Sequence, residues 1–443
     1  MNSIVKIKQL ILVTGDVLML YLSLALTLLI RYDQPFNNRI LDIHLGPFTY
    51  IFIFWIFIFY IAGLYDIRHL KNDLDFFKKF GTTLIVNAGL AIATFYILPL
   101  DIAPKTNLFI LLAFFAVLGF IWRRLYNKFI SSSIPGTNVL LIGNNDTIKE
   151  IVKQVENNPQ LGYTIKYWLK DELGDKEIDH ISQIIISENI DLIAIPDHIK
   201  KDSKTARAIY RNLALGIETI DIASFYERIF KKVPLSELSE VWFLENLVSQ
   251  NKIYETIKQP CEIIMAFIMM IVLSPLMVLI GLLVKLTSRG PAIYKQTRVG
   301  QYESEFMLYK FRTMTKDAEK KGAQWSQKND ARVTTLGKFL RRSHLDELPQ
   351  LMNIIKGEAS FVGPRPERPE FTEDLKKVIP HYELRHLVRP GIAGWAQLNY
   401  SYGASVEDAY QKLQYDIFYL KNKSFWLDLG IVIKTLRMFF VKN

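Results

Sequence analysis

Residues 341–367 read RRSHLDELPQLMNIIKGEASFVGPRPE, and two adjacent carboxylates, Asp346 and Glu347, stand just ahead of Pro349. Proline lacks an amide proton and is tolerated only in the first turn of a helix, so a helix through residues 351–355 begins no earlier than about Asp346. The sequence therefore predicts both carboxylates at a helix N-terminus. There the unsatisfied amides and the helix dipole favour the ionised form, which is available as a nucleophile or as a metal ligand.

Basic residues flank this acidic pair in the sequence. They are Arg341, Arg342 and Arg365. Pro364 and Pro366 stiffen the backbone on either side of Arg365. Acid beside base at this density predicts a site for a phosphate group and a divalent cation. A second interpretation stays open at this point, in which the segment is a capped surface helix and Ser343 and Asp346 form a capping box.

Length and composition indicate a membrane protein of two or three domains. The chain has 443 residues, of which 50% are hydrophobic and 13% aromatic, and the apolar residues fall in runs. The net charge of +10 does not indicate a nucleic-acid partner, because the basic residues cluster beside apolar runs, where they set orientation and attract anionic lipid. Cys261 is the only cysteine, which excludes an intrachain disulfide and a metal site of several thiolates.

Four apolar segments open the chain, each close to the ~17–25 residues that cross a bilayer as a helix. They are residues 10–30, 47–64, 80–100 and 108–122. Nine basic residues lie before the first segment, between the second and third, and after the fourth: Lys6, Lys8, Arg68, Lys71, Lys78, Lys79, Arg123, Arg124 and Lys128. The other two connections carry only Arg31, Arg39 and Lys105. Because cytoplasmic loops carry the excess of Lys and Arg, both ends of this four-helix transmembrane bundle are predicted in the cytoplasm, together with the chain that follows.

Asp16 lies inside the first apolar segment. A charged residue within a membrane span is a candidate for function. We favour the alternative, a residue close to the cytoplasmic interface or bonded between helices.

A soluble alternation of strands and helices follows a linker at residues 131–137. Strands are predicted at 138–142, 163–168, 191–195 and 217–220, and helices at 148–156, 178–187 and 206–215. This alternation predicts a small Rossmann-like parallel sheet of the doubly wound kind. The first strand-to-helix turn holds only one glycine of the dinucleotide fingerprint, Gly143, so a structural, regulatory or dimer-forming role is favoured over cofactor binding. The bundle and the sheet domain are thus candidates for pairing two chains in a homodimer.

An uncharged run at residues 263–284 is interrupted by Ser274 and Pro275. Basic residues stand on both flanks, which indicates that the segment enters and leaves the membrane by the same face. Proline removes a helix hydrogen bond and clashes with the preceding turn, and Ser274 is placed to satisfy one of the freed backbone groups. We therefore predict a re-entrant helix-break-helix, with arms of about 11 and 9 residues that are too short to cross, roughly 16 and 14 Å. A fifth true span, with an external C-terminal domain, is the alternative.

Residues 425–441, FWLDLGIVIKTLRMFFV, carry three charges among apolar residues and are predicted to form an amphipathic helix at the membrane surface. The predicted organisation is a transmembrane domain at 1–130, a Rossmann-like cytoplasmic domain at 131–250 and a mostly helical domain at 251–443. The last domain contains the re-entrant helix, at 260–288, and the C-terminal amphipathic helix.

Several strings in the last domain, taken together, resemble one family. They are GP at 290–291, QTRVG at 296–300, KFRTM at 310–314, SHLDELPQL at 343–351, KGE at 356–358, FVGPRP at 361–366, RPGIAGWAQ at 389–397 and KLQYDIFYL at 412–420. Their order and spacing resemble the monotopic phosphoglycosyl transferases, the bacterial sugar transferases that initiate lipid-linked glycan assembly. The catalytic resemblance covers residues 259–443. The bundle and sheet domain look like the long-form members, which initiate exopolysaccharide or O-antigen repeats.

This resemblance implies an enzyme on the cytoplasmic face of the bacterial inner membrane. It implies that Asp346 attacks the β-phosphate of a UDP-sugar and releases UMP, and that undecaprenyl phosphate then takes the sugar phosphate. Glu347 and Asp346 would hold Mg²⁺, and Ser274 and Pro275 would form the membrane break. The residues implied to bind substrate phosphates are Lys310, Arg312, Arg341 and Arg365. Long-form relatives often transfer glucose or galactose 1-phosphate, which favours a hexose.

Two positions depart from the family pattern. Residues 302–305 (YESE) stand where a glycine-containing turn is usual, and Ala393 stands where threonine is common. Both lie outside the carboxylate pair, so they concern loop shape and sugar preference. A function of another class is a catalytically inactive membrane scaffold or regulator of a polysaccharide assembly complex. The intact strings around Asp346 and Arg365 favour the enzyme.

Overall fold

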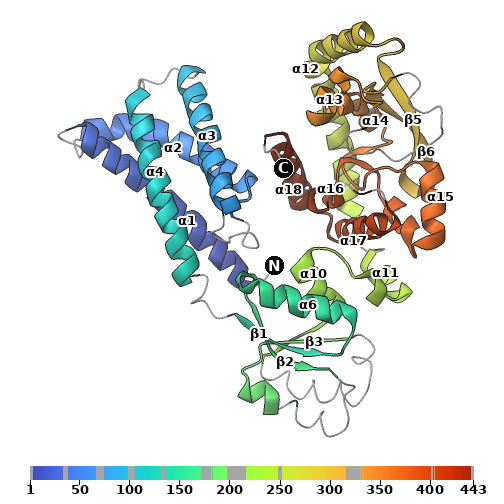
Figure 1. Ribbon diagram of the computed structural model, residues 1–443, viewed down its shortest axis with the longest axis horizontal. Coiled ribbons are helices and arrows are strands. Elements are labelled where there is room, and N and C mark those ends of the chain that lie inside the picture. The colour runs from blue at the N-terminus through green and yellow to red at the C-terminus, as the bar shows by residue number, and fades with distance from the viewer. Residues whose placement is uncertain are drawn as a thin grey trace. The chain divides into compact units, whose positions relative to one another are not determined.

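The computed structural model (Figure 1) describes residues 3–32, 38–65, 74–97, 105–130, 136–170, 181, 183–196, 216–247, 252–315, 330, 332–400, 403 and 405–440. The chain divides into two compact units, Met1–Ile229 and Phe230–Asn443. Each unit has its own buried core.

The predicted N-terminal bundle is present as four helices. They are α1 (Ser3–Arg31), α2 (Asn38–Ile61), α3 (Leu74–Ile97) and α4 (Lys105–Leu125), and a π-helical turn, η2 (Tyr126–Ile130), follows α4. Aromatic residues fill the space between them, including Phe48, Trp55 and Phe115, all buried. Within the described ranges, α1, α2, α4 and the later α12 (Lys252–Thr287) are long and apolar enough to cross a membrane. The third predicted segment forms a helix but is not among those four.

Asp16 in α1 forms a buried ion pair with Arg123 in α4. Arg123 also donates a hydrogen bond to the main-chain oxygen of Leu64, after α2. The preferred interpretation of Asp16, a residue bonded between helices, is therefore confirmed.

The predicted parallel sheet is confirmed, with strand order β2-β1-β3-β4. Its strands are β1 (Thr137–Ile142), β2 (Tyr163–Leu169), β3 (Leu192–Ile195) and β4 (Glu218–Asp221), and all three pairings are parallel. Helix α6 (Asp146–Asn157) begins after the turn at Gly143, with Asn145 as its N-cap. The predicted helix at 206–215 and the first part of the one at 178–187 lie outside the described residues.

The second unit is mostly helical, with two small sheets. Its remaining helices and turns are α10 (Ile222–Phe230, which ends in it), η5 (Leu235–Glu237), α11 (Glu240–Leu247), α13 (Thr335–Arg342), η7 (Leu345–Gln350), α14 (Leu351–Ile355), α15 (Pro369–Val378), η8 (Tyr382–Leu387), α16 (Trp395–Asn399), α17 (Val406–Asn422) and α18 (Phe425–Phe440). Strands β5 (Ile293–Val299) and β6 (Glu305–Phe311) form an antiparallel hairpin, while β7 (Ser360–Val362) and β8 (Gly391–Ala393) pair in parallel. Tyr302 and Glu303, in the turn η6 (Gln301–Glu303) of the hairpin, have φ of 52° and 61°. Glycine adopts this left-handed conformation without steric cost, so the departure at 302–305 places larger residues in a turn that suits glycine.

Helix α12 differs from the predicted helix-break-helix. It continues from Lys252 to Thr287 through Ser274 and Pro275, so the two arms are longer than predicted. The physical reason is at Ile271, whose oxygen loses the amide of Pro275 and instead accepts a hydrogen bond from the Ser274 hydroxyl at 2.7 Å. The ribbon of α12 nevertheless changes direction along its length in Figure 1, as expected at an internal proline.

Helix α18 confirms the predicted C-terminal helix. Its exposed apolar residues recur at one-turn spacing: Phe425, Trp426, Leu429 and Val432. Asp428 and Ile431 lie on the opposite face and are buried against the unit. The carboxylate of Asp428 therefore faces the protein, and the large exposed side chains over residues 425–435, where side chains are described, are apolar.

Candidate active site

The carboxylate pair lies in the first turn of a helical segment, as predicted. Helix α13 ends at Arg342, His344 takes a left-handed conformation with φ of 51°, and the 3₁₀ turn η7 begins at Leu345. Asp346 and Glu347 follow, and α14 continues from Leu351. The left-handed residue reverses the chain between two helical segments, which leaves both carboxyl groups at the start of the second one.

The capping-box interpretation is wrong. Ser343 ends α13, and its hydroxyl donates to the main-chain oxygens of Phe339 and Leu340 at 2.9 and 3.2 Å. Ser343 therefore belongs to the preceding helix, and it does not cap the turn that carries Asp346.

Glu347 is held by two basic side chains from distant parts of the sequence. Lys310 of β6 donates to its Oε1 atom at 2.8 Å, and Arg365 donates to the same atom at 3.1 Å. Burial raises the pKa of Glu347, but the charges of Lys310 and Arg365 outweigh burial and lower the pKa to about 2. Glu347 is therefore ionised at neutral pH.

Asp346 has different surroundings. Its carboxylate accepts no hydrogen bond from the residues that the structure describes, although the residue is only 7% exposed. Burial raises its pKa; the Lys310 charge lowers it, the Glu347 charge raises it, and Arg341 lowers it. Burial and the neighbouring carboxylate thus oppose the ionisation that the helix start favours at Asp346, and the sequence did not predict these two contributions. A carboxylate without a hydrogen-bond donor beside one whose Oε1 atom accepts two charged donors points to two different roles.

A small hollow opens beside Glu347. Its walls are formed by Arg298, Leu308, Lys310, Gln350, Arg365, Pro366 and Gly391. Three of these residues are basic; Glu347 pairs with Lys310 and Arg365, and Glu367 lies 3.9 Å from Arg298. The lining itself carries no acidic side chain, so the hollow suits an anion such as a phosphate group. Arg298 and Gln350 lie within the motif strings at 296–300 and 343–351, but the sequence predicted a phosphate-binding role for neither.

The predicted phosphate-binding residues divide into two groups. Lys310 and Arg365 both donate to Glu347. The charge of Arg341 lowers the pKa of Asp346, and its Nε atom donates to the hydroxyl of Thr313 at 2.9 Å. Arg312 instead turns to the end of α12, where its Nη2 atom donates to the main-chain oxygen and hydroxyl of Ser288. The role of Arg312 at a phosphate group stays a prediction.

Two motif strings meet where β7 pairs with β8. A Cβ on Gly363 would lie 2.3 Å from the main-chain oxygen of Arg389, and one on Gly391 would lie 2.0 Å from the amide nitrogen of Gly363. The two backbones can approach this closely only with glycine at both positions. The approach joins the FVGPRP string, which carries Arg365, to the RPGIAG string.

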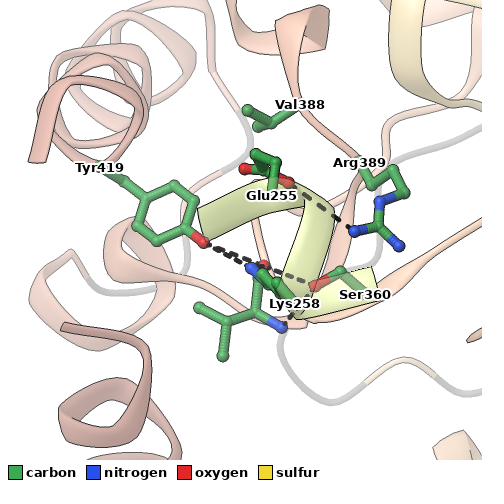
Figure 2. Close-up of a pocket in the computed structure, with 7 residues that line it drawn as sticks. Glu255, Lys258, Ser360, Val388, Arg389 and Tyr419 are labelled. Atoms are coloured by element: carbon green, nitrogen blue, oxygen red, sulfur yellow. Dashed lines mark hydrogen bonds and ion pairs between the residues drawn. The ribbon is translucent and has the colours of Figure 1, made fainter. Parts of the chain in front are cut away.

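Figure 2 shows a second polar cluster, in which Lys258 of α12 reaches β7. Lys258 donates to the main-chain oxygen of Val362 and to the hydroxyl of Tyr419, both at 3.0 Å, and pairs with Asp428 of α18 at 2.6 Å. Ser360 donates to Glu262, one turn further along α12, at 2.6 Å. In the sequence, Lys258 is one of the basic residues that flank the apolar run at 263–284. No sequence pattern indicates that Lys258 has a buried partner.

The donor atoms of the carboxylate pair bear on the metal prediction. No group of three or more His, Cys, Asp or Glu side chains that would hold a metal ion occurs among the described residues. Mg²⁺, however, is often bound by one or two carboxylates together with substrate phosphates and water. Oε2 of Glu347 and both oxygens of Asp346 accept no hydrogen bond within the described part of the chain. The pair therefore fits a magnesium ion that shares its coordination with a phosphate group.

Comparison with known proteins identifies the class of protein that this fold and site define. Residues 253–442 match the family model described as bacterial sugar transferase. Across 185 residues the chain is 35% identical to the exopolysaccharide production protein PSS of Rhizobium leguminosarum bv. phaseoli, and the match spans 92% of that protein and 40% of this chain. The chain therefore belongs to the bacterial sugar transferase family, and the recognition made from the motifs is confirmed.

Two further relatives carry names that state a reaction. The chain is 46% identical over 187 residues to the UDP-N-acetylgalactosamine-undecaprenyl-phosphate N-acetylgalactosaminephosphotransferase of Aeromonas hydrophila. This match spans 42% of this chain and 44% of that protein. It is 41% identical over 191 residues to the UDP-glucose:undecaprenyl-phosphate glucose-1-phosphate transferase of Xanthomonas campestris pv. campestris, with 42% of this chain and 40% of that protein covered. The matches thus span less than half the length of these two relatives.

Proposed function

We propose that this protein transfers a sugar 1-phosphate from a UDP-sugar to undecaprenyl phosphate and releases UMP. The observation that carries the proposal is the division of the carboxylate pair, with Glu347 held between Lys310 and Arg365 and Asp346 left free. Relatives named for this class of reaction support the choice of substrates.

The transfer proceeds in two displacements at one phosphorus atom. A carboxylate oxygen of Asp346 forms a bond to the β-phosphorus of the UDP-sugar, while the bond from that phosphorus to the bridging oxygen breaks and UMP leaves with the oxygen. An oxygen of undecaprenyl phosphate then attacks the same phosphorus and releases the carboxylate. The product is undecaprenyl-diphospho-sugar, and it initiates the repeat unit of an exopolysaccharide or O-antigen.

Basic residues neutralise the charge that phosphoryl transfer spreads over the phosphate oxygens. Lys310 and Arg365 contact Glu347 and line the hollow, while the charge of Arg341 lowers the pKa of Asp346. Asp346 and Glu347 would hold Mg²⁺, which supplies further positive charge to the diphosphate when bound. Arg365 exposes 43% of its side chain, so it is free to shift from Glu347 to a phosphate group.

The membrane arrangement follows from α12 and α18. Ala266, early in α12, packs on Leu351 and Ile354, while Val284, late in α12, packs with Phe311 and Leu340. A straight helix would separate residues 266 and 284 by about 27 Å, close to the thickness of the hydrocarbon core. Because both residues pack on the same unit, α12 would enter and leave the membrane by one face. Its exposed apolar middle would lie in the lipid. The apolar outer face of α18 would lie on the same leaflet. Charge around the apolar segments favours the cytoplasmic face of the bacterial inner membrane.

The test is UMP release by the full chain in detergent, with Mg²⁺ and a short polyprenyl phosphate. The donors are UDP-glucose, UDP-galactose and their N-acetyl counterparts, since the relatives differ in the sugar that their names state. We expect release of UMP with at least one donor, dependent on the acceptor for repeated turnover. No release from any donor would overturn the enzyme and favour the scaffold.

A further inference from the structure

The loop at residues 364–367 carries Arg365, and each of its four main-chain oxygens accepts a hydrogen bond. The amide nitrogens of Gly391 and Val299 bond the outer two, at Pro364 and Glu367, each at 2.9 Å. The inner two are bonded by side chains. Arg385 donates to the oxygen of Arg365 at 3.1 Å, and Arg298 donates to the oxygen of Pro366 at 2.9 Å. Two guanidinium groups are thus committed to the backbone of a single short loop.

Arg385 is itself held firmly. It is 5% exposed, it lies 2.9 Å from the carboxylate of Asp416 on α17, and it donates to the hydroxyl of Tyr382. Asp416 is 1% exposed, so both charges are removed from water. Removing one partner of such a buried pair leaves an uncompensated charge and is destabilising. Asp416 therefore holds Arg385 in a fixed position.

Neither Arg385 nor Asp416 has a hydrogen bond or ion pair to the carboxylates of Asp346 and Glu347 in the described chain. The hydrogen bond from Arg385 to the main-chain oxygen of Arg365 connects this pair to the site. The backbone at Arg365 is fixed by the flanking prolines and by these hydrogen bonds, while its side chain stays partly exposed. A fixed backbone limits the positions that the Arg365 guanidinium can reach. It favours positions at Glu347 and beside the hollow.

We propose that Arg385, fixed by Asp416, is a positioning residue for Arg365 in the transfer reaction. This inference rests on the proposed function, and it goes beyond the residues that the family motifs single out. Loss of the Arg385 contact leaves Arg365 in the chain but lets its backbone shift. A displacement of about 1 Å at a group that binds the transferred phosphate costs up to about 100-fold in rate.

A double-mutant cycle tests this inference on the full chain, using the donor that gives UMP release with the wild type. The variants are Arg385→Gln, Arg365→Ala and the double variant, with Lys377→Gln as the matched control because Lys377 is exposed and forms an ion pair with nearby Asp374. We expect Arg385→Gln to lower kcat/KM about 10- to 100-fold, and the double variant to be within about twofold of Arg365→Ala. The control is expected to match the wild type.

A second variant covers the case in which Arg385→Gln does not fold. Asp416→Asn keeps the side-chain volume, and its effect should likewise disappear in the Arg365→Ala background. If the double variant is active and the losses in kcat/KM of the two single variants multiply in it, the positioning role is overturned. Failure of both Arg385→Gln and Asp416→Asn to fold would also overturn it and leave a purely structural pair. Absence of UMP release by the wild type would instead overturn the proposed function itself.

Discussion

Asp346 and Glu347 are neighbours in the chain, but the fold gives them opposite electrostatic surroundings. Lys310 and Arg365 outweigh burial at Glu347 and lower its pKa, while burial and the adjacent charge raise the pKa of Asp346. A carboxylate with a raised pKa is the more reactive nucleophile once ionised, because its charge is less stabilised by its neighbours. These different surroundings support the roles proposed for the two residues, with Asp346 as the nucleophile and Glu347 at the phosphate and metal.

The pH dependence of turnover follows from this separation. Only ionised Asp346 can attack phosphorus, so kcat/KM should fall as the pH drops through the pKa of Asp346. Arg341 lowers that pKa, so Arg341→Gln should raise it further and move the acid limb of kcat/KM to higher pH. Arg342→Gln, which removes an exposed charge next in sequence, is the control and should leave the limb in place. An unmoved limb in Arg341→Gln would show that a different group controls it.

Sequence spacing predicted the acidic pair, Arg341 and Arg365, since all lie within one motif-rich stretch. Lys310 was indicated only by the family resemblance, since 37 residues separate it from Glu347. Sequence spacing did not predict Arg385, because a contact to a main-chain oxygen has no sequence signature. The raised pKa of Asp346 was missed for a related reason, since burial depends on tertiary packing and helix position does not determine it.

At the scale of elements, hydrophobic periodicity was sufficient for the four helices of the bundle and the four strands of the parallel sheet. The limits of α12 were less accurate, because an internal proline usually ends a helix. Here the hydroxyl of Ser274 replaces the missing donor and the helix continues. Local chemistry at one residue therefore decided the length of an element.

Lys258 fastens α12 to both β7 and α18, so its loss should destabilise the second unit. Breaking a buried ion pair by removing one partner costs about 3–5 kcal/mol. We expect Lys258→Met to lower the midpoint of thermal unfolding in detergent markedly, and Lys258→Met with Asp428→Leu to lower it less than the sum of the single changes. Lys377→Met, at an exposed position, is the control. Additive effects of the two changes would show that Lys258 and Asp428 do not act as a pair.

At the scale of the whole molecule, two units with separate cores share one chain. The family match lies within the second unit, and the Rhizobium relative is matched over 92% of its length by 40% of this chain. The residues proposed for the reaction also all belong to the second unit. Residues 230–443 should therefore carry the chemistry without the bundle and the sheet.

A fragment of residues 230–443, purified in detergent, tests this expectation. It should release UMP from the same donor as the full chain, with kcat/KM within about tenfold, since all the proposed site residues are retained. Residues 230–247 are kept because Val233, Leu235 and Phe243 belong to the core of this unit. A folded but inactive fragment would assign part of the active site to the first unit.

The covalent intermediate is the most direct test of the whole account. The full chain is incubated with a UDP-sugar labelled in the sugar, with Mg²⁺ and without acceptor, and the protein is quenched and digested for mass spectrometry. We expect a sugar phosphate on the peptide that contains Asp346, with about one UMP released per chain, and no label in Asp346→Asn. Label on another residue, or UMP release by Asp346→Asn at the wild-type rate, would contradict it.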